Sequence, residues 1–260
     1  MLRASFRFYA ELNDHLASEQ QYKTLEKSFF VPASVKDMIE GIGVPHTEVD
    51  LIAANGRSVD FSYLVQDGDR IAVYPVFESF DVAGEQRLRP RPLRNPTFIL
   101  DVHLGKLTAY LRMLGFDAKY GRSLDDAKLA RISSGEHRIL LTRDRGLLKH
   151  GLVTHGYWVR ETNSRRQIAE VMHRFDLARA IRPFTRCMAC NGPLEPITKG
   201  LARGLVPERS LEQYDDFHRC RQCGRVYWKG SHYSRMRRWI DELAPRYDPS
   251  ERPDSAPPLK

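Results

Sequence analysis

Apolar and polar residues alternate along short stretches of the first eighty residues, a period that predicts β-strands. Residues 5–9 alternate in this way, and residues 29–31 end a second extended stretch. Residues 49–53 and 70–74 have the same character. Each stretch has the length of an ordinary strand, so this part of the chain is expected to form a small sheet.

One helix and one tight turn are expected among these strands. Ser34 is followed three residues later by Asp37, a pair typical of a helix start, and apolar residues then recur at helical spacing up to Gly43. Asn55-Gly56 separates two extended stretches and favours a two-residue hairpin. Strands around a single helix in so short a length predict a β-grasp fold.

From residue 98 the pattern changes to strands that alternate with helices. Buried strands are predicted at residues 98–100, 138–142 and 157–159, and a further strand begins at residue 116. Helical spacing of apolar residues appears in three segments between and after them, which are residues 104–114, 126–132 and 168–175. This order predicts an α/β domain in which helices cover a parallel sheet.

Charge divides the chain more sharply than hydropathy does. The whole sequence has 41 Lys and Arg against 33 Asp and Glu, a formal net charge of +8. Residues 1–86 hold 7 basic against 14 acidic residues, residues 87–180 hold 19 against 9, and residues 181–260 hold 15 against 10. A basic surface is the footprint of a nucleic-acid partner. Contact with RNA is therefore expected only after residue 86, because the acidic first third repels phosphate.

Several classes of protein do not fit this composition. Hydrophobic residues make up 42% and aromatic residues 10% of the chain, enough for packed cores, which excludes a globally disordered protein. No apolar run has the length of a membrane-spanning helix, and the first residues lack a signal-peptide core. The four cysteines fall within one segment, unlike those of a disulfide-rich secreted scaffold. We therefore expect a cytoplasmic protein with no membrane partner.

Acidic residues follow the predicted strands of the middle segment where a ligand would bind. Asp101 and Asp144 each come directly after a buried strand, and the carboxyl ends of parallel strands form the ligand-binding edge of such sheets. Asp125 and Asp126 open a helix that is expected to face the same edge. Converging carboxylates repel one another unless a cation lies among them, and oxygen ligands suit Mg²⁺ or Mn²⁺. Such an ion can activate a water for attack on a phosphodiester.

Each carboxylate also has a structural explanation. A strand-end aspartate such as Asp101 is often only the N-cap of the next helix. Ser123 and Asp126 fit a capping box, which explains Asp126 completely and leaves Asp125 as the better ligand candidate. Asp144 can pair with a neighbouring arginine. Taken together, these aspartates are favoured as a metal site, because they occur within a basic domain.

Two Cys-x-x-Cys pairs predict a zinc site. Cys187 and Cys190 form one pair, Cys220 and Cys223 the other, and four thiolates satisfy tetrahedral Zn²⁺. The pairs are farther apart than usual, so a long insertion is expected between them. A redox dithiol is the alternative, but neither pair has the βαβ context of such sites. A closed four-thiolate site is structural because it leaves no position open for a substrate.

Basic and aromatic residues interleave after the second pair, over residues 225–239. Such a surface can grip a single strand of RNA by phosphate pairing and base stacking, which is the favoured interpretation. The alternative is that Tyr227 and Trp228 pack a strand of the zinc module and that Trp239 packs a helix. The last sixteen residues contain five prolines and are predicted to be a disordered tail.

The segment LIAANGRSVDFSYLVQDGDRIAVYPVF resembles the closing hairpin and final strand of the ubiquitin-like sulfur carriers. The resemblance implies a ubiquitin-like β-grasp. In a carrier the chain ends in a diglycine whose carboxylate is loaded, whereas here the chain continues and the only nearby glycine is Gly84. Carrier chemistry is therefore not expected, and the domain is interpreted as a docking module for a protein partner.

The segment FILDVHLGKLTAYLRMLGFDAKYGRSLDDAKLARISSGEHRILLTRDRGLLK looks like the PIN-like ribonuclease domain named after the carboxyl-terminal part of the Mut-seven exonuclease. The resemblance covers about residues 97–235 and includes RVYWKGSH after the second cysteine pair. It implies that the acids that bind a catalytic metal are Asp101, Asp125 and Asp144. It also implies that the substrate phosphate meets the basic residues Lys106, Arg112 and Arg143. Glu161 is the candidate for a fourth acid.

Together these observations predict an α/β protein of five segments, three of them folded. They are a ubiquitin-like β-grasp domain (1–82), an Arg- and Pro-rich linker (83–97), a PIN-like α/β/α domain with a parallel sheet (98–180), a zinc-ribbon-like four-cysteine module (181–244) and a tail (245–260). The predicted function is a ribonuclease that hydrolyses RNA phosphodiester bonds with catalytic Mg²⁺ or Mn²⁺ and structural Zn²⁺. The alternative is a non-catalytic, zinc-containing RNA-binding adaptor that docks through its ubiquitin-like domain.

Overall fold

The computed structural model of the protein describes residues 1–75 and 96–243. The predicted tail, most of the predicted linker and Gly84 lie outside the described residues. The chain divides into two compact units, one of Met1–Gly105 with Lys119–Arg160 and the other of Lys106–Ala118 with Glu161–Lys260. Among the helices of the described residues, none combines the length and apolar character that crossing a membrane requires.

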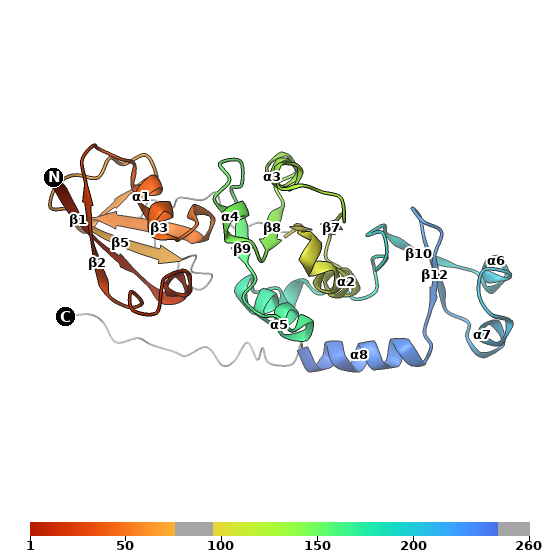
Figure 1. Cartoon of the computed structure of the whole chain (residues 1–260). Helices are drawn as coiled ribbons and strands as arrows, with labels where there is room; N and C mark the ends of the chain where they lie inside the picture. The colour runs from red at the N-terminus through yellow and green to blue at the C-terminus, as the bar shows by residue number, and fades with distance from the viewer. Residues whose placement is uncertain (76–95, 244–260) are drawn as a thin grey trace. The chain divides into compact units, whose positions relative to one another are not determined.

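Strands and helices follow one another along the described chain in an order that separates three sheets (Figure 1). The strands are β1 (Leu2–Phe8), β2 (Thr24–Phe29), β3 (Val49–Ala54), β4 (Arg57–Val59), β5 (Arg70–Pro75), β6 (Phe98–Leu100), β7 (Ala118–Tyr120), β8 (Ile139–Thr142), β9 (Gly156–Trp158), β10 (Leu194–Ile197), β11 (Phe217–Cys220) and β12 (Val226–Trp228). The α-helices are α1 (Val35–Ile42), α2 (Gly105–Met113), α3 (Asp126–Gly135), α4 (Arg145–Leu148), α5 (Ser164–Arg174), α6 (Lys199–Ala202), α7 (Glu208–Gln213) and α8 (Ser231–Leu243). Short 3-10 helices are η1 (Ala10–His15), η2 (His46–Glu48), η3 (Val102–Leu104) and η4 (Ala178–Ala180).

The first unit begins with a five-stranded sheet in the order β2-β1-β5-β3-β4. β1 is parallel to β5 and antiparallel to β2, and β3 is antiparallel to both β4 and β5. One face of β1 buries Phe6 and Phe8 in a core shared with Val35 and Ile39 of α1, so α1 covers that face (Figure 1). The predicted ubiquitin-like β-grasp is confirmed.

Local chemistry sets the helix start and the hairpin as predicted. The Ser34 hydroxyl accepts a hydrogen bond from the Asp37 backbone N–H at 3.1 Å and donates to the Asp37 carboxylate at 2.7 Å, which caps α1. Asn55 and Gly56 have φ values of 52° and 81°, the left-handed pair that a tight turn between β3 and β4 requires.

The second sheet of this unit has the strand order β7-β6-β8-β9. β6 and β9 both run parallel to β8. Every residue of β6 and β8 is buried, as expected for strands covered on both faces. Ile99 and Leu140 pack in one core with Leu129 of α3 and Leu148 of α4. The predicted parallel α/β sheet is confirmed, although β7 begins at Ala118 rather than at residue 116.

The predicted capping box of Ser123 and Asp126 is wrong. Helix α3 begins at Asp126, and the N-cap is Asp125, whose carboxylate accepts a hydrogen bond from the Lys128 backbone N–H at 2.8 Å. An N-cap side chain bonds the N–H two or three residues ahead, and Asp125 stands at that distance. Asp125, which was expected to be the better ligand candidate because it caps no helix, is therefore the N-cap of α3.

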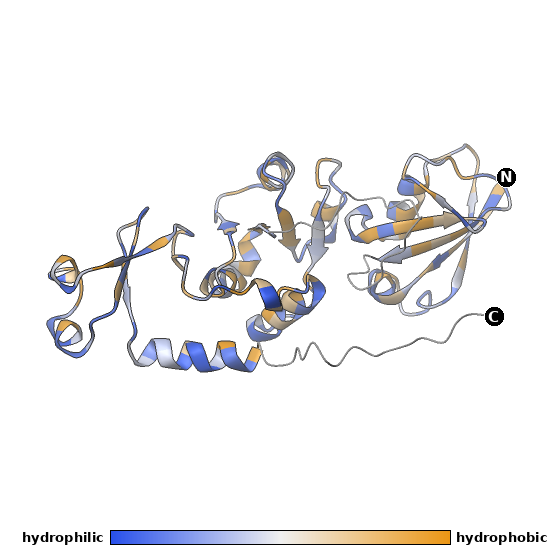
Figure 2. Cartoon of the chain, turned by 180° about the vertical axis from the view of Figure 1, so that it is seen from behind, coloured by the Kyte–Doolittle hydropathy of each residue, from blue (hydrophilic) through white to orange (hydrophobic). Residues whose placement is uncertain are grey.

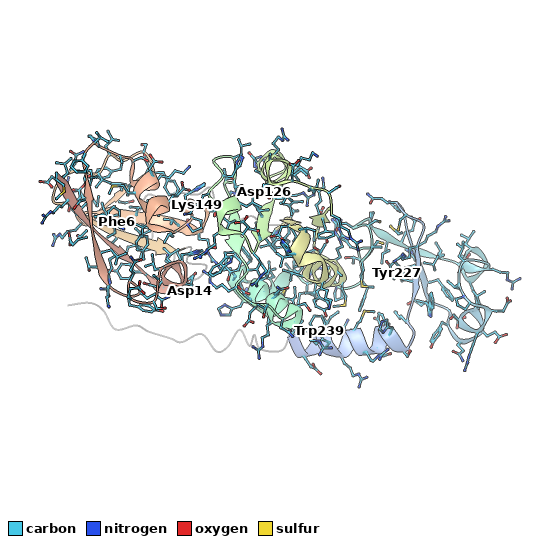
Figure 3. The ribbon with its side chains drawn as sticks, in the orientation of Figure 1. Phe6, Asp14, Asp126, Lys149, Tyr227 and Trp239 are labelled. Carbon is cyan, nitrogen blue, oxygen red and sulfur yellow. The ribbon has the colours of Figure 1, made fainter. Side chains whose placement is uncertain are left out.

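The second unit joins helices α2, α5 and α8 to a small antiparallel sheet in the order β10-β11-β12. The hydropathy colouring shows α8 as mostly hydrophilic (Figure 2). Its Trp239 ring, labelled in Figure 3, lies 4.7 Å from the Tyr110 ring of α2 and under the Arg165 guanidinium of α5 at 5.8 Å. The predicted long insertion holds α6 and α7, and Ala202 and Leu211 from it pack against Phe217 of β11.

Candidate functional site

The four cysteines form one compact cluster in the second unit. All four are free thiols, and their sulfurs lie within 4.8 Å of one another. Cys187 Sγ is 3.6 Å from Cys223 Sγ, and Cys190 Sγ is 3.3 Å from Cys220 Sγ, too far for a disulfide bond. A tetrahedron with Zn–S bonds of about 2.3 Å has edges of about 3.8 Å. The thiols therefore fit a metal ion such as zinc, and they are the only such cluster among the described residues.

The turns around the cysteines are built by the backbone. The Asn191 N–H donates to the Cys187 carbonyl, and the Gly224 N–H donates to the Cys220 carbonyl, which closes one turn at each pair. A Cβ placed on Gly192 would lie 2.8 Å from Cys220 Sγ. Only glycine at this position lets the first turn approach the second pair, which explains a glycine just beyond the first knuckle.

Hydrogen bonds around Cys187 favour its thiolate. Burial opposes ionisation of this thiol, but the Tyr227 hydroxyl at 3.1 Å and the backbone N–H groups of Ala189 and Cys190 lower its pKa to about 6. A thiolate is the form that binds metal. Tyr227 thus stabilises the thiolate of Cys187 through its hydroxyl. The alternation of basic and aromatic residues in the sequence does not predict this hydrogen bond.

Arg112 connects this cluster to helix α2. The side chain is only 5% exposed, and its Nε donates to the Ala118 carbonyl at 2.8 Å. Its Nη1 donates to the carbonyls of Met188 and Ala189, inside the first cysteine turn, at 3.2 and 2.8 Å. These bonds occupy the guanidinium inside the protein. The structure gives Arg112 a structural task, and its predicted contact with a substrate phosphate has no support here.

Asp101 lies at the end of β6 with both carboxylate oxygens in use. Oδ1 accepts from the His103 N–H at 2.8 Å, which makes Asp101 the N-cap of η3. Oδ2 accepts a short hydrogen bond from the Thr142 hydroxyl and another, at 3.0 Å, from the Arg143 N–H. The same hydroxyl accepts from the Asp144 N–H at 2.9 Å. Thr142, which carries no charge and drew no attention in the sequence, therefore joins the ends of β6 and β8.

Asp144 and Asp125 are also N-cap residues, and both are exposed. Asp144 Oδ1 accepts from the Gly146 N–H at 2.7 Å and starts α4, while within the described chain Oδ2 forms no hydrogen bond. For Asp125, the hydrogen bond from the Lys128 backbone holds the pKa of the carboxyl below its usual range. Helix capping thus explains all three predicted acids. Asp101 and Asp144 share the Thr142 hydroxyl, whereas Asp125 caps a separate helix.

The remaining predicted residues occupy different environments. Arg143 is half-buried, and its Nη1 donates to the backbone carbonyls of Val159 and Arg160 at 3.4 and 3.1 Å. Lys106 is exposed on the first turn of α2. Glu161 lies in the second unit, where its N–H donates to the Glu170 carboxylate at 3.0 Å.

Within the first unit, one buried carboxylate of the β-grasp reaches β9. Glu48 is 1% exposed, and its Oε1 accepts from the Trp158 backbone N–H at 2.7 Å. Its Oε2 lies 2.9 Å from His15 Nε2 and 3.1 Å from Arg160 Nη2. Burial alone would raise the pKa of Glu48, but His15, Arg160 and the Trp158 N–H lower it to about 2. Arg160 also pairs with Asp14, labelled in Figure 3, at 2.7 Å.

The same contact continues in the segment that precedes β9. Lys149 Nζ donates to the Glu40 carbonyl at 2.7 Å, Arg145 Nη1 donates to the His15 carbonyl at 3.1 Å, and His46 Nε2 lies 2.9 Å from the Val153 carbonyl. These pairs stand more than 100 positions apart in the sequence, so no local pattern predicts them. The β-grasp domain therefore binds the α/β domain of its own chain.

The aromatic residues after the second cysteine pair are half-buried and each contacts another part of the second unit. Tyr227 bonds Cys187, Trp228 packs against the core of the zinc-ribbon-like module, and Trp239 meets Tyr110. These contacts support the packing alternative, while the half-buried rings leave the predicted stacking of RNA on them a prediction. Basic residues such as Arg235 and Arg238 remain exposed on α8.

Comparison with protein families gives two matches, and they follow the predicted order. Residues 1–81 match the family described as Mut7-C ubiquitin, and residues 96–240 match the family described as the Mut7-C RNAse domain. The second match alone covers more than half of the chain. Comparison with curated proteins gave no match, and comparison with solved structures gave none. The RNAse-domain match indicates a nuclease-type function and RNA as the substrate class.

Proposed function

We propose, because this chain belongs to the Mut7-C RNAse domain family, that it is a metal-dependent ribonuclease whose chemistry occurs at the strand ends of β6 and β8. The observation that carries the proposal is the pairing of Asp101 and Asp144 around Thr142. It stands at the carboxyl edge of a parallel sheet, where α/β folds bind their ligands. The attack of water on an RNA phosphorus atom, with cleavage of a P–O bond, is the proposed reaction.

The carboxylates support this role by their chemistry and their accessibility. Asp144 is exposed and keeps Oδ2 without a hydrogen bond from the described residues, so it can bind a cation or hold a water. Asp101 is fixed by three donors and can orient Asp144 through the shared hydroxyl. Asp125 is the proposed third acid, and Lys106 and Arg143 are the proposed phosphate contacts.

Mg²⁺ or Mn²⁺ is the proposed cofactor of this site. Oxygen donors suit a hard divalent cation, and such an ion would supply an activated water and charge stabilisation at the phosphate. No three acids of the described residues come together as closely as the four thiols do. Closure of the acids around an ion would therefore accompany binding of the ion or of RNA.

Cleavage of labelled RNA by the purified full-length chain tests the proposal most directly. Structured and unstructured RNAs are incubated with added Mn²⁺ or Mg²⁺ and, in parallel, without divalent metal, while the zinc content of the same samples is measured. We expect cleavage only with added metal. The Asp144→Asn variant should lose about a hundredfold or more of the rate, since Asn retains the N-cap but not the charge.

Asp126→Asn is the matched control, because Asp126 is an exposed acid of the same domain that caps no helix. Its cleavage rate should equal that of the unaltered chain. Full activity of Asp144→Asn and of Asp101→Asn, or equal activity without any divalent metal, would refute the proposal.

The observation that all three aspartates are helix caps favours a second candidate function. A non-catalytic RNA-binding adaptor would need these residues only for folding. It predicts RNA affinity that falls steeply with salt and no cleavage with any divalent metal. The same assay therefore distinguishes the two candidates.

Zinc is the proposed occupant of the cysteine cluster, and its role is structural because four thiolates leave no open position. Free thiols in this number suit a reducing compartment such as the cytoplasm. The β-grasp remains the proposed docking site for a protein partner, through the surface that the contact with β9 leaves open.

A further inference from the structure

The outer face of the β-grasp sheet carries a hollow of about 470 Å³, open to solvent. Its floor consists of small side chains on three neighbouring strands, Ser5, Ala53 and Ala72. Residues on β1 and β5 alternate between this face and the core, so Phe6 and Val73 lie on the core side of the sheet. Helix α1 covers the opposite face of the sheet, which leaves this one without a covering element among the described residues.

Two arginines line the hollow without a partner. Arg7 on β1 and Arg70 on β5 form no ion pair or side-chain hydrogen bond with the described residues. No acidic residue is among those that line the hollow. Glu26, opposite Ser5 on β2, is the nearest acid in the register of this face. The domain is acidic as a whole. At this concave surface, however, the neighbouring strands β1 and β5 each contribute one guanidinium group.

A pair of aromatic rings stands beside these arginines. Tyr9 and Tyr74 are stacked, with ring centroids 4.4 Å apart and planes 12° from parallel. Burial and a hydrogen bond between its hydroxyl and Tyr9 raise the pKa of Tyr74, which keeps the hydroxyl neutral at physiological pH. Tyr9 is 38% exposed, and a ring on the outside of a stack can receive a further aromatic ring.

We propose that this hollow binds single-stranded RNA, with a base stacked on Tyr9 and the adjoining phosphates on Arg7 and Arg70. Guanidinium groups beside aromatic rings on an open sheet face are the combination that single-stranded nucleic acid needs. An acidic protein segment would use the two arginines but would gain nothing from the stacked rings. The inference rests on the proposed function for its substrate class, and it makes the acidic domain a second contact for that substrate.

This inference reverses the expectation that the acidic first third repels RNA. Net charge describes the field at a distance, which salt screens within about 10 Å, whereas binding depends on groups in contact. Long-range electrostatic attraction of RNA toward this face is weak, because the domain as a whole is acidic. The hollow is therefore expected to hold RNA that the basic part of the chain has already recruited.

Binding of a fluorescent oligouridine to the full-length chain, without added divalent metal, tests the proposal separately from cleavage. The double variant Arg7→Glu/Arg70→Glu should bind about tenfold more weakly or worse at moderate salt, and its salt dependence should be shallower. Tyr9→Ala should lose about fivefold or more through base stacking. Both should remain folded at the temperature of the assay, because these side chains line the outer face of the sheet and not its core.

Lys36→Glu is the matched control, since it reverses a charge on α1, across the sheet from the hollow. Its affinity should change less than twofold. Equal affinity of the double variant and Lys36→Glu would overturn the proposal, as would an unchanged affinity of Tyr9→Ala, which would indicate only an anion surface. Binding of a labelled polyglutamate peptide that the double variant loses, with RNA affinity unchanged, would assign the face to an acidic protein instead. Failure of the proposed nuclease appears only in the cleavage assay of Asp144→Asn.

Discussion

The four cysteine thiols lie against one another, whereas each of the three aspartates lies against the start of a helix. In the cysteine cluster every ligand atom is within 4.8 Å of the others, and the backbone turns serve that arrangement. The aspartates are each bound by a backbone N–H two or three residues ahead. In the cysteine cluster the fold brings possible metal ligands together, whereas helix capping alone already explains the position of each aspartate.

The largest expected effect is at the cysteines. Cys187→Ser should remove the bound zinc and the cooperative folding of the β10-β11-β12 sheet, because structural zinc supplies about 10 kcal/mol or more of binding free energy to such modules. Zinc per chain and hydrogen exchange of the β11 amides measure this. Ala189→Ser, an exposed change within the same turn, is the control and should keep both at the level of the unaltered chain. Full zinc content in Cys187→Ser would contradict the cluster as the zinc site.

The next effect concerns Glu48, a carboxylate that is neither a metal ligand nor a helix cap. Its folded pKa of about 2 lies below the ordinary 4.5, so its charge stabilises the fold above about pH 4.5 and the contribution is lost as pH falls toward 2. A difference of this size corresponds to about 3 kcal/mol. Glu48→Gln should lose about that much at pH 7 in urea unfolding, and less at pH 3.

Glu19→Gln is the control for this experiment, since Glu19 is exposed on the same domain. It should unfold as the unaltered chain does at both pH values. A deficit of Glu48→Gln that stays constant between pH 7 and pH 3 would mean that the charge of Glu48 is not what stabilises the contact.

A smaller effect separates capping from charge at Asp144. Asp144→Ala should lower the free energy of unfolding by about 1 kcal/mol, because the Gly146 N–H loses its acceptor, whereas Asp144→Asn should keep it. Both variants should lose cleavage. Thermal unfolding and the RNA assay on the same samples measure the two properties, and an active Asp144→Ala would leave Asp144 with capping alone.

The smallest expected effect on stability is at Asp125, an exposed carboxylate that caps a separate helix. Asp125→Asn should keep the melting temperature, since Asn also accepts from the Lys128 N–H. Its cleavage rate should fall, because the proposal makes Asp125 the third acid. An unchanged rate together with an unchanged melting temperature would remove Asp125 from the site.

Features set by neighbouring residues could be predicted from the sequence. The alternation around Phe6, the turn at Asn55-Gly56 and the two cysteine pairs each depend on residues a few positions apart, and the structure confirms all three. The family resemblance gave both families and their order along the chain correctly. Helix starts were less certain, because Ser123 and Asp125 are both good caps and only the start of α3 decides between them.

Features set by distant residues were missed. The Glu48 contact with Arg160 spans 112 positions, and the bond of Arg112 to Met188 spans 76. The role of Thr142 could not be predicted, because a threonine at a strand end can form many different hydrogen bonds. Only the three-dimensional structure shows that its hydroxyl donates to Asp101. Short helices such as α4 and α6 depend on a cap and on tertiary packing rather than on their own periodicity.

The hydrogen bond from the Trp158 N–H to Glu48 has a consequence for how this protein behaves at high concentration. β9 is the outermost strand of its sheet, and an outermost strand with free N–H groups invites pairing with a strand of another molecule. Glu48 occupies one of those N–H groups with a buried charge, and η2 lies beside the strand. The β-grasp thus stands where a second molecule would add its strand, and we expect it to limit pairing of this sheet with another copy of the chain.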